Sequence, residues 1–123
     1  MFDMNNLKMT NDFLGHQGGD KIIAALGAIL KEEAREYGFI GRYGGDEFLA
    51  IFEKGDKSIV EAFLGKVYER ANNYNENQEH KLEKIWYAAG YTIANPSVHD
   101  IEDIIHEADN RMYLDKRRLK SQL

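Results

Sequence analysis

The sequence predicts an α+β domain in which strands from separate parts of the chain form one sheet and helices pack against it. Two short segments rich in aromatic and β-branched residues flank a Gly-Gly pair and predict a β-hairpin. Other segments place apolar residues at helical spacing, and one later segment alternates like a strand. With 123 residues and 43% hydrophobic content, the chain is long enough for one domain and too short for two.

The first expected helix runs from Asp20 to Tyr37, and Gly38 is expected to cap its C-terminus. Its apolar residues recur at i, i+1, i+4, i+7 and i+8, which gives one apolar stripe: Ile22, Ile23, Leu26, Ile29 and Leu30. The same region holds the longest apolar run of the chain, which is half the length that a bilayer span needs. We therefore expect a buried helix here and no membrane contact from this segment.

The hairpin is expected from residues 39–43 and 48–52, with Gly44 and Gly45 where a tight turn needs positive φ. Strand alternation is expected to send Asp46 and Glu47 to opposite faces, so that only one of them need face a site. From these residues alone, two interpretations stay open. The hairpin either binds a metal and a phosphate, or it simply begins with solvated acidic residues.

The remaining elements follow the hairpin. A second helix carries one apolar face and ends in the polar stretch 72–80, which we expect to be the mobile loop. Residues 85–94 alternate like a strand that ends at Pro96. A last helix is expected at 101–116, followed by basic residues. Its predicted inward positions are Ile101, Ile104, Ile105, Ala108 and Met112.

Composition excludes some classes of function. The formal charge of −5 and pI near 5.4 argue against nucleic acid as the main partner, because such binding normally needs a basic face. A single nucleotide held through metal ions is still allowed. Cysteine is absent, so there is no disulfide framework and no thiolate metal site. That absence suits the reducing cytoplasm, which is the expected location.

Three motifs resemble the GGDEF family of diguanylate cyclases. The first is R-Y-G-G-D-E-F at residues 42–48. The second, residues 3–20, is similar to the family run D-x-[DN]-x-[FL]-K-x-x-N-D-x-x-G-H-x-x-G-D. The third, residues 108–116, resembles A-D-x-A-[ML]-Y-x-A-K, with Arg111 and Asp115 replacing small residues. The resemblance covers nearly the whole chain.

This resemblance implies a fold and a metal site. The fold is a mainly antiparallel sheet like the palm of nucleotidyl cyclases and polymerases, with the first strand central and the hairpin beside it. Asp3 would then face Asp46 across the sheet. The resemblance implies two Mg²⁺ ions, with Mn²⁺ as the alternative, held by Asp3, Asp46 and the carbonyl of Met4. Glu47 would support the metal site or help to deprotonate a 3′-hydroxyl.

GTP is the implied substrate. A loop after Asp3 that includes Asn6 and Leu7 would cradle its phosphates through backbone N–H groups. Gly44 and Gly45 would let the nucleotide approach the backbone closely. The countercharges would come from Lys8, Lys116 and Lys120, although Leu119 stands where the family usually has glycine. The alternative for the basic run 116–118 is that it complements the dipole at a helix C-terminus.

Asn11 and Asp20 match the guanine readers of the family, since a carboxylate accepts from guanine N1–H and N2–H. The alternative is that both residues cap helices. Asp12 and His16 are assigned to structure. The string from residue 15 to 21 lacks the spacing of a phosphate-binding P-loop. His99 and His106 are expected on a solvated helix edge.

Two departures from the family bear on function. Residues 35–38 read Arg35-Glu36-Tyr37-Gly38 where many members carry an inhibitory R-x-x-D, so feedback by product should weaken. The chain also opens at Met1-Phe2-Asp3, without the family's N-terminal helix and most of its first strand. We therefore expect one GGDEF domain over residues 1–123 that lacks these parts.

Three functional hypotheses follow. The leading one is a homodimeric diguanylate cyclase that joins two GTP molecules into cyclic di-GMP and two pyrophosphates. The second is an inactive module that binds GTP or cyclic di-GMP, or an inert truncated fragment. The third is a protein-interaction domain in which the acidic hairpin is incidental, and it would show no metal-dependent nucleotide binding.

Overall fold

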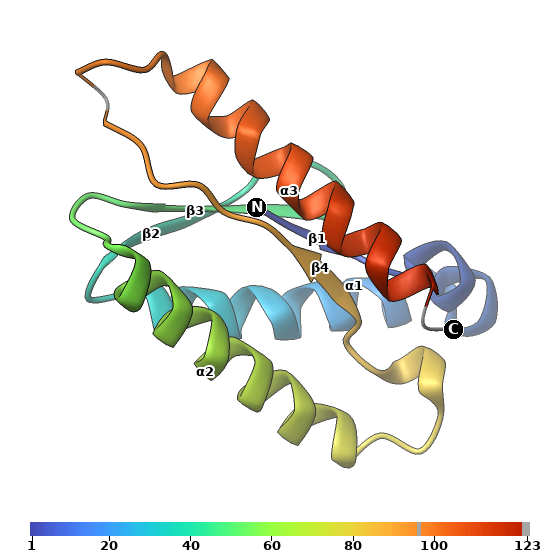
Figure 1. Ribbon diagram of the computed structural model, residues 1–123. Helices are drawn as coiled ribbons and strands as arrows, with labels where there is room; N and C mark the ends of the chain where they lie inside the picture. Colours follow the sequence, from blue (N-terminus) through green and yellow to red (C-terminus); the bar gives the residue numbers. More distant parts are fainter. Residues whose placement is uncertain (96, 122–123) are drawn as a thin grey trace.

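The computed structural model describes residues 1–95 and 97–121, and it combines one sheet with three long helices (Figure 1). The strands are β1 (Phe2–Met4), β2 (Gly38–Arg42), β3 (Glu47–Phe52) and β4 (Tyr87–Ala89). The helices are α1 (Leu7–Ala34), α2 (Lys57–Glu76) and α3 (Ile101–Ser121), with a 3₁₀ turn η1 at Lys81–Glu83. Among the described residues, no helix is both long enough and apolar enough to cross a bilayer.

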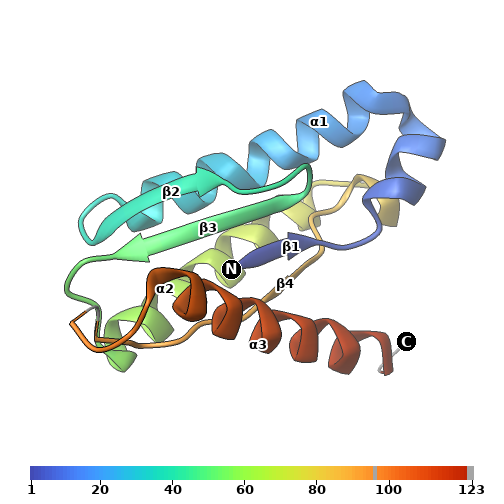
Figure 2. The same cartoon turned by 90° about the horizontal axis from the view of Figure 1, so that it is seen from above.

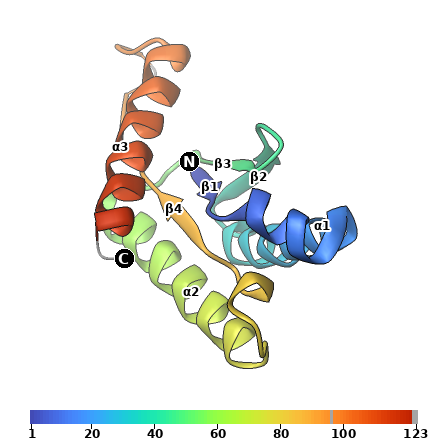
Figure 3. The same cartoon turned by 90° about the vertical axis from the view of Figure 1, so that its right-hand side faces the viewer.

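The four strands form one antiparallel sheet in the order β2-β3-β1-β4. The first strand of the chain therefore lies inside the sheet, beside the hairpin formed by β2 and β3, as expected from the sequence. Helices α1 and α2 cover one face of the sheet, and α3 covers the other (Figures 1 and 3). This arrangement confirms the predicted α+β class.

Two separate cores hold these layers together. The larger core lies between the sheet and helices α1 and α2, and it contains Phe2, Met4, Leu26 and Phe63. The smaller core lies beneath α3 and contains Met1, Ala88, Ala108 and Met112. Because side chains alternate along a strand, Asp3 points to the same face as Met1, toward α3. The alternation of β1 thus places one carboxylate under the last helix.

Helix α1 is longer than the sequence predicted, and it is broken. It begins at Leu7 rather than near Asp20, and Gly15 interrupts it with φ 79° and ψ 172°. Glycine has no Cβ and tolerates this backbone conformation, so the break falls where it costs least. The expected C-cap at Gly38 is wrong, because Gly38 begins β2 and pairs with Phe52.

The predicted mobile loop at 72–80 is also wrong over its first half, because α2 continues to Glu76. The buried side chain of Asn75 donates to the Ile85 carbonyl oxygen at 2.9 Å and accepts from the Ile85 N–H at 2.6 Å. These two bonds fasten the end of α2 to the chain entering β4. The polar Asn75 therefore connects α2 to the segment before β4, although the polar composition of this stretch had indicated a loop.

Two other predictions need correction. The strand expected at 85–94 forms a β-strand only over Tyr87–Ala89, because its partner β1 pairs through three residues. Pro96, where that strand was expected to end, lies outside the described residues. Helix α3 runs on to Ser121, and Ile101 at its start is 59% exposed rather than inward. The other inward positions of α3 are buried or half-buried, as expected.

Candidate active site

The candidate site lies where β1, the start of β3 and α3 meet. The register pairs Asp3 of β1 with Glu47 of β3, and the Met4 N–H donates to the Asp46 carbonyl oxygen at 2.9 Å. The strand partner of Asp3 is therefore Glu47, and Asp46, which was expected to face Asp3, lies one position before that partner. It also precedes β3, so strand alternation does not direct its side chain, contrary to the sequence-based expectation.

The three carboxylates influence one another electrostatically. Partial burial raises the pKa of Asp46, and the neighbouring Asp3 charge raises it further. Burial also raises the pKa of Glu47, followed by the charges of Asp3, Asp109 and Asp46. Like charges placed opposite each other destabilise a sheet, so this cluster is costly unless a cation joins it.

Lys116 provides one such cation. Its Nζ donates to Asp3 Oδ2 at 2.9 Å, and the Asp3 side chain is only 12% exposed. The bond crosses from α3 to β1, so it fixes the last helix over the acidic cluster. Lys116 therefore does more than complement a helix dipole. The side chain of Lys120 lies outside the described residues.

One of the two family departures in this helix has a structural role. Asp115 Oδ2 accepts from the Ala89 N–H at 2.9 Å, on the outer edge of β4. Edge strands expose unpaired backbone groups, and a charged side chain is one way to cover them. Asp115 also accepts from Arg118 Nη2 at 2.8 Å. The aspartate that replaces a small residue therefore secures α3 to the sheet edge.

Three buried side-chain oxygens in this region lack a hydrogen-bond partner among the described residues: Asp3 Oδ1, Asn5 Oδ1 and Asn11 Oδ1. Buried polar atoms are normally paired, and each unpaired one costs roughly 1–3 kcal/mol. All three come from one stretch of nine residues that links β1 to α1. Each of these oxygens could accept a hydrogen bond or, for Asp3, bind a cation.

These residues fit a hard divalent cation. Asp3 Oδ1 is a buried oxygen without a partner, and Asp46 is a second carboxylate whose pKa is raised by burial and then by the charge of Asp3. Mg²⁺ prefers such carboxylate oxygens and keeps several of its waters. The described residues contain no group of three or more His, Asp or Glu side chains arranged as a complete metal site. A bound ion would therefore need ligands from water or substrate as well.

The glycines of the hairpin behave differently from the expectation. Neither Gly44 nor Gly45 has a positive φ; Gly15 is the one glycine with a positive φ in the described chain. Arg42 Nη2 donates to the Gly45 carbonyl oxygen at 2.6 Å, which braces the turn. A Cβ added at Gly45 would meet nothing within 4 Å. Gly45 therefore leaves open space next to Asp46, whereas a Cβ at Gly44 would contact the Glu47 side chain.

The predicted phosphate and base residues lie on α1. Asn6 precedes the helix in a left-handed conformation, and Leu7 and the exposed Lys8 form its first turn. The helix N-terminus thus presents free backbone N–H groups beside the end of β1, an arrangement suited to an anion.

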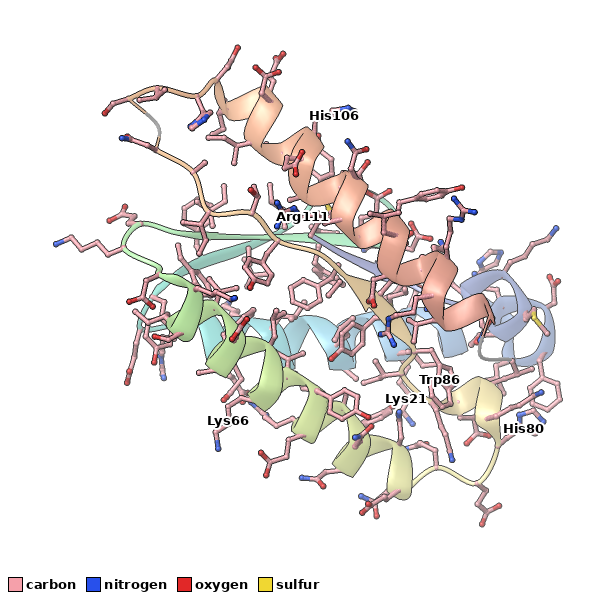
Figure 4. All side chains as sticks on the ribbon, in the orientation of Figure 1. Lys21, Lys66, His80, Trp86, His106 and Arg111 are labelled. Atoms are coloured by element: carbon pink, nitrogen blue, oxygen red, sulfur yellow. The ribbon has the colours of Figure 1, made fainter. Side chains whose placement is uncertain are left out.

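Asn11 and Asp20 lie on either side of the break at Gly15. A Cβ at Gly19 would collide with Asn11 Oδ1, so the break folds the residue before Asp20 onto Asn11. Neither residue caps a helix, because both lie within α1. His16 is exposed, and so is His106, which points away from the sheet on α3 (Figure 4).

Sequence reasoning missed two residues of this region. Asn5 was not singled out, although it directly follows β1 and comes two positions after Asp3. Asp109 raises the pKa of Glu47 through its charge. Asp109 precedes Lys116 by seven residues, or two helical turns. Helical periodicity could therefore have placed Asp109 on the same face of α3 as Lys116.

Comparisons with known proteins identify the family of the chain. The profile described as diguanylate cyclase, GGDEF domain, matches residues 1–122. A diguanylate cyclase from Vibrio cholerae is 29% identical over 117 residues, which cover 94% of this chain and 35% of that protein. The signaling protein YkoW of Bacillus subtilis is 31% identical over 121 residues, which cover 97% of this chain and 15% of YkoW. The chain thus spans about a third or less of these two relatives.

Two solved structures have the same fold. The GGDEF domain of DgcB from Caulobacter crescentus in complex with c-di-GMP superposes with a TM-score of 0.80 at 27% identity, covering 94% of this chain and 69% of that one. The active GGEEF domain of a diguanylate cyclase from Vibrio cholerae superposes with a TM-score of 0.78 at 26% identity, covering 95% of this chain and 74% of that one. With the acidic hairpin, the interior first strand and a profile match over nearly every residue, the chain belongs to the GGDEF family of diguanylate cyclase domains.

Proposed function

We propose that this chain is a diguanylate cyclase domain that condenses two GTP molecules into cyclic di-GMP and two pyrophosphates. In each condensation, a 3′-hydroxyl oxygen bonds to the α-phosphorus of the other GTP, the bond to pyrophosphate breaks, and the hydroxyl proton is removed. The observation that carries the proposal is the buried, unpartnered Asp3 Oδ1 beside Asp46 and Glu47 of the acidic hairpin.

Asp3 and Asp46 would hold Mg²⁺, with the Met4 carbonyl as a further ligand and Mn²⁺ as the alternative ion. When bound, the metal would supply positive charge to the phosphate oxygens, where negative charge develops during transfer. Glu47 would support this site or accept the proton of the 3′-hydroxyl. Its raised pKa favours proton acceptance, because it makes the carboxylate a stronger base than free glutamate.

The start of α1 would bind the phosphates. Its first-turn N–H groups, including that of Leu7, would donate to phosphate oxygens, and Lys8 would neutralise their charge. Lys116 would contribute after exchanging its bond to Asp3 for one to a phosphate. The Asn11 amide would donate to guanine O6 or N3, and Asp20 would accept from the N1–H and N2–H edge.

Catalysis would require a homodimer. One protomer binds one GTP, and two bound nucleotides must meet face to face before each 3′-hydroxyl can reach the other α-phosphate. A monomer would bind GTP without cyclising it. The expected setting is the cytoplasm, where GTP is available.

A second candidate is a module that binds the nucleotide without catalysis. It is favoured by the Lys116–Asp3 bond, which gives one carboxylate a protein cation in place of a metal. In that case, GTP binding would persist while no cyclic di-GMP formed. Feedback through the R-x-x-D site is expected to be weakened or lost in either case, because Gly38 stands where that motif has its aspartate.

The test is to incubate the purified chain with GTP and Mg²⁺ and to detect cyclic di-GMP by mass spectrometry. Asp46→Asn removes a proposed metal ligand while keeping the side-chain shape. Glu69→Gln is the matched control, since Glu69 is a 65% exposed carboxylate on α2, paired with Lys66 at 3.8 Å. GTP binding is measured in parallel with a fluorescent GTP analogue.

Product from the chain and from Glu69→Gln, but none from Asp46→Asn, would support the cyclase. GTP binding without product in any variant would favour the binding module. If the chain neither binds GTP nor forms product, both candidates are wrong, and the site has another role.

A further inference from the structure

The first half of α1 carries several of the proposed nucleotide-binding residues, but little of it joins the main core. Gly15, with φ 79° and ψ 172°, divides the helix into a first half, residues 7–14, and a second half, residues 16–34. The α1 residues buried in the larger core all follow this break, from Ile22 onward. Among the described residues, the first half adds Leu7 to the packing against that core and no buried member. The position of the first half therefore depends on other contacts.

Those contacts come from the segment that joins α2 to β4, residues 77–86, which we call the connector. It includes the 3₁₀ turn η1 and lies beside the first half of α1 (Figures 2 and 3). Thr10, which is only 3% exposed, donates from Oγ1 to the Leu82 carbonyl oxygen at 2.9 Å. One turn along the helix, the Phe13 ring stacks on the His80 ring with centroids 4.4 Å apart. The Leu82 N–H donates to Nδ1 of the same histidine at 3.0 Å, so the two contacts support each other.

The connector is in turn fixed to α2 and to the sheet. Asn75, near the end of α2, bonds to both backbone groups of Ile85. The Trp86 carbonyl oxygen accepts from the Asn5 N–H at 2.7 Å, directly after β1. The Trp86 indole N–H also donates to the Lys81 carbonyl oxygen at 3.0 Å, which joins this end of the connector to η1. A side chain of α1 that bonds to η1 is therefore held in place relative to the sheet.

The break in α1 separates the two proposed base readers. Asn11 follows Thr10 directly and lies before the break, whereas Asp20 lies after it. Because Gly15 is not helical, no continuous helix fixes the separation of these two side chains. A Cβ at Gly15 would meet nothing within 4 Å, so packing on that side does not hold the break. The halves meet where the Asn11 side chain lies against Gly19, which has no side chain of its own to hold the amide. The contacts with the connector therefore decide where Asn11 lies relative to Asp20.

We propose that Thr10 is a positioning residue for guanine recognition. Through its bond to Leu82, it holds the first half of α1 so that the Asn11 amide and the Asp20 carboxylate meet the same base. This role rests on the proposed function, because it takes Asn11 and Asp20 as the base readers. Thr10 acts through Asn11 rather than on the nucleotide, since its hydroxyl is buried and already bonded to Leu82.

The test measures the Kd of 3′-deoxy-GTP with Mg²⁺ for the 123-residue chain by isothermal titration calorimetry. This nucleotide lacks the hydroxyl that attacks in the transfer, so it reports binding alone. Thr10→Val keeps the shape of the side chain and removes the hydroxyl. Because the Leu82 carbonyl oxygen then loses its donor, the affinity should fall about three- to tenfold.

Two further variants control for this change. Thr10→Ser keeps the donor and should restore the affinity. Ser58→Ala removes a hydroxyl that bonds to Asp56 Oδ1 at 2.8 Å, at the exposed start of α2, and it should bind the nucleotide like the parent chain.

A double-mutant cycle separates positioning from stability. Asn11→Ala removes the amide that Thr10 positions. In the Asn11→Ala background, Thr10→Val should lower the affinity no further, whereas its effect on the urea midpoint should persist.

An equal loss of affinity in both backgrounds would overturn the proposal, because it would indicate general damage to the fold. Parent-like affinity of Thr10→Val, or failure of Thr10→Ser to restore it, would also overturn it. If the parent chain does not bind 3′-deoxy-GTP, the positioning role and the proposed function are both wrong. Binding of 3′-deoxy-GTP without formation of cyclic di-GMP from GTP would exclude the cyclase alone, and the cycle would still decide the role of Thr10.

Discussion

Replacement of Lys116 by methionine tests the Asp3–Lys116 bond that fastens α3 to the sheet. Lysine and methionine have similar helix propensities, so α3 itself should be little affected. The change leaves the Asp3 carboxylate buried without its cation, beside Asp46 and Glu47. Breaking a fully buried ion pair costs roughly 3–5 kcal/mol. Because the Lys116 side chain is 28% exposed, we expect a smaller loss, about 2 kcal/mol in the free energy of unfolding.

The measurement is urea denaturation at pH 7 followed by circular dichroism, with the slope unchanged and the midpoint lowered. In thermal unfolding, the loss corresponds to a decrease of about 6–10 °C in Tm. Lys66→Met is the matched control. Lys66 lies on the exposed side of α2 and pairs with Glu69 at 3.8 Å, so its loss should cost less than about 0.5 kcal/mol (Figure 4).

A double-mutant cycle separates the charge effect from lost packing. Asp3→Asn removes the charge that Lys116 neutralises, so adding it to Lys116→Met should recover about 1–2 kcal/mol. If the free energy of unfolding of Lys116→Met lies within 0.5 kcal/mol of the parent value, as that of Lys66→Met should, the Asp3–Lys116 bond does not hold α3 in place. Zero coupling in the cycle would likewise refute the reasoning.

Three further predictions concern the carboxylates, a buried amide and a glycine. Asp46→Asn should raise the free energy of unfolding at pH 7, because a carboxyl whose pKa is raised on folding destabilises the folded state once ionised. This advantage should disappear as the pH falls toward the ordinary value of 3.8, and denaturation measured across that range checks the sign. Asn75→Ala should cost about 2–4 kcal/mol in chemical denaturation, since it leaves the N–H and C=O of one buried residue unpaired. Asn77→Ala, which removes one exposed bond of 3.2 Å, should cost less than about 1 kcal/mol; equal losses would contradict the role of Asn75. Gly38→Asp should destabilise the chain by about 1–3 kcal/mol because its Cβ meets β3 backbone, whereas Gly41→Asp has open space; similar thermal shifts for both would disprove the clash.

The local elements could be predicted from the sequence because their signals are local. The apolar stripe of α1 and the aromatic strands around Gly44 and Gly45 predicted a helix and a hairpin, and both are present. The motif at residues 42–48 identified the family. The ends of helices and strands were less predictable, as the early start of α1 and the short β4 show, because they depend on the elements that each helix or strand packs against or pairs with. A three-residue β1 limits how much of β4 can pair, and no local pattern in residues 85–94 contains that information.

The site divides in the same way. The sequence by itself determined which carboxylates, amides and lysines the chain carries and at what spacing, and therefore which chemistry is possible. Only the tertiary structure decided that Asp3 pairs with Glu47, that Lys116 reaches Asp3 from the far end of the chain, and that Asn75 holds a joint rather than a loop. The physical reason is the sequence distance over which each interaction acts. Periodicity and turn chemistry act over a few residues, whereas strand register, burial and charge coupling depend on segments that meet only when the chain folds.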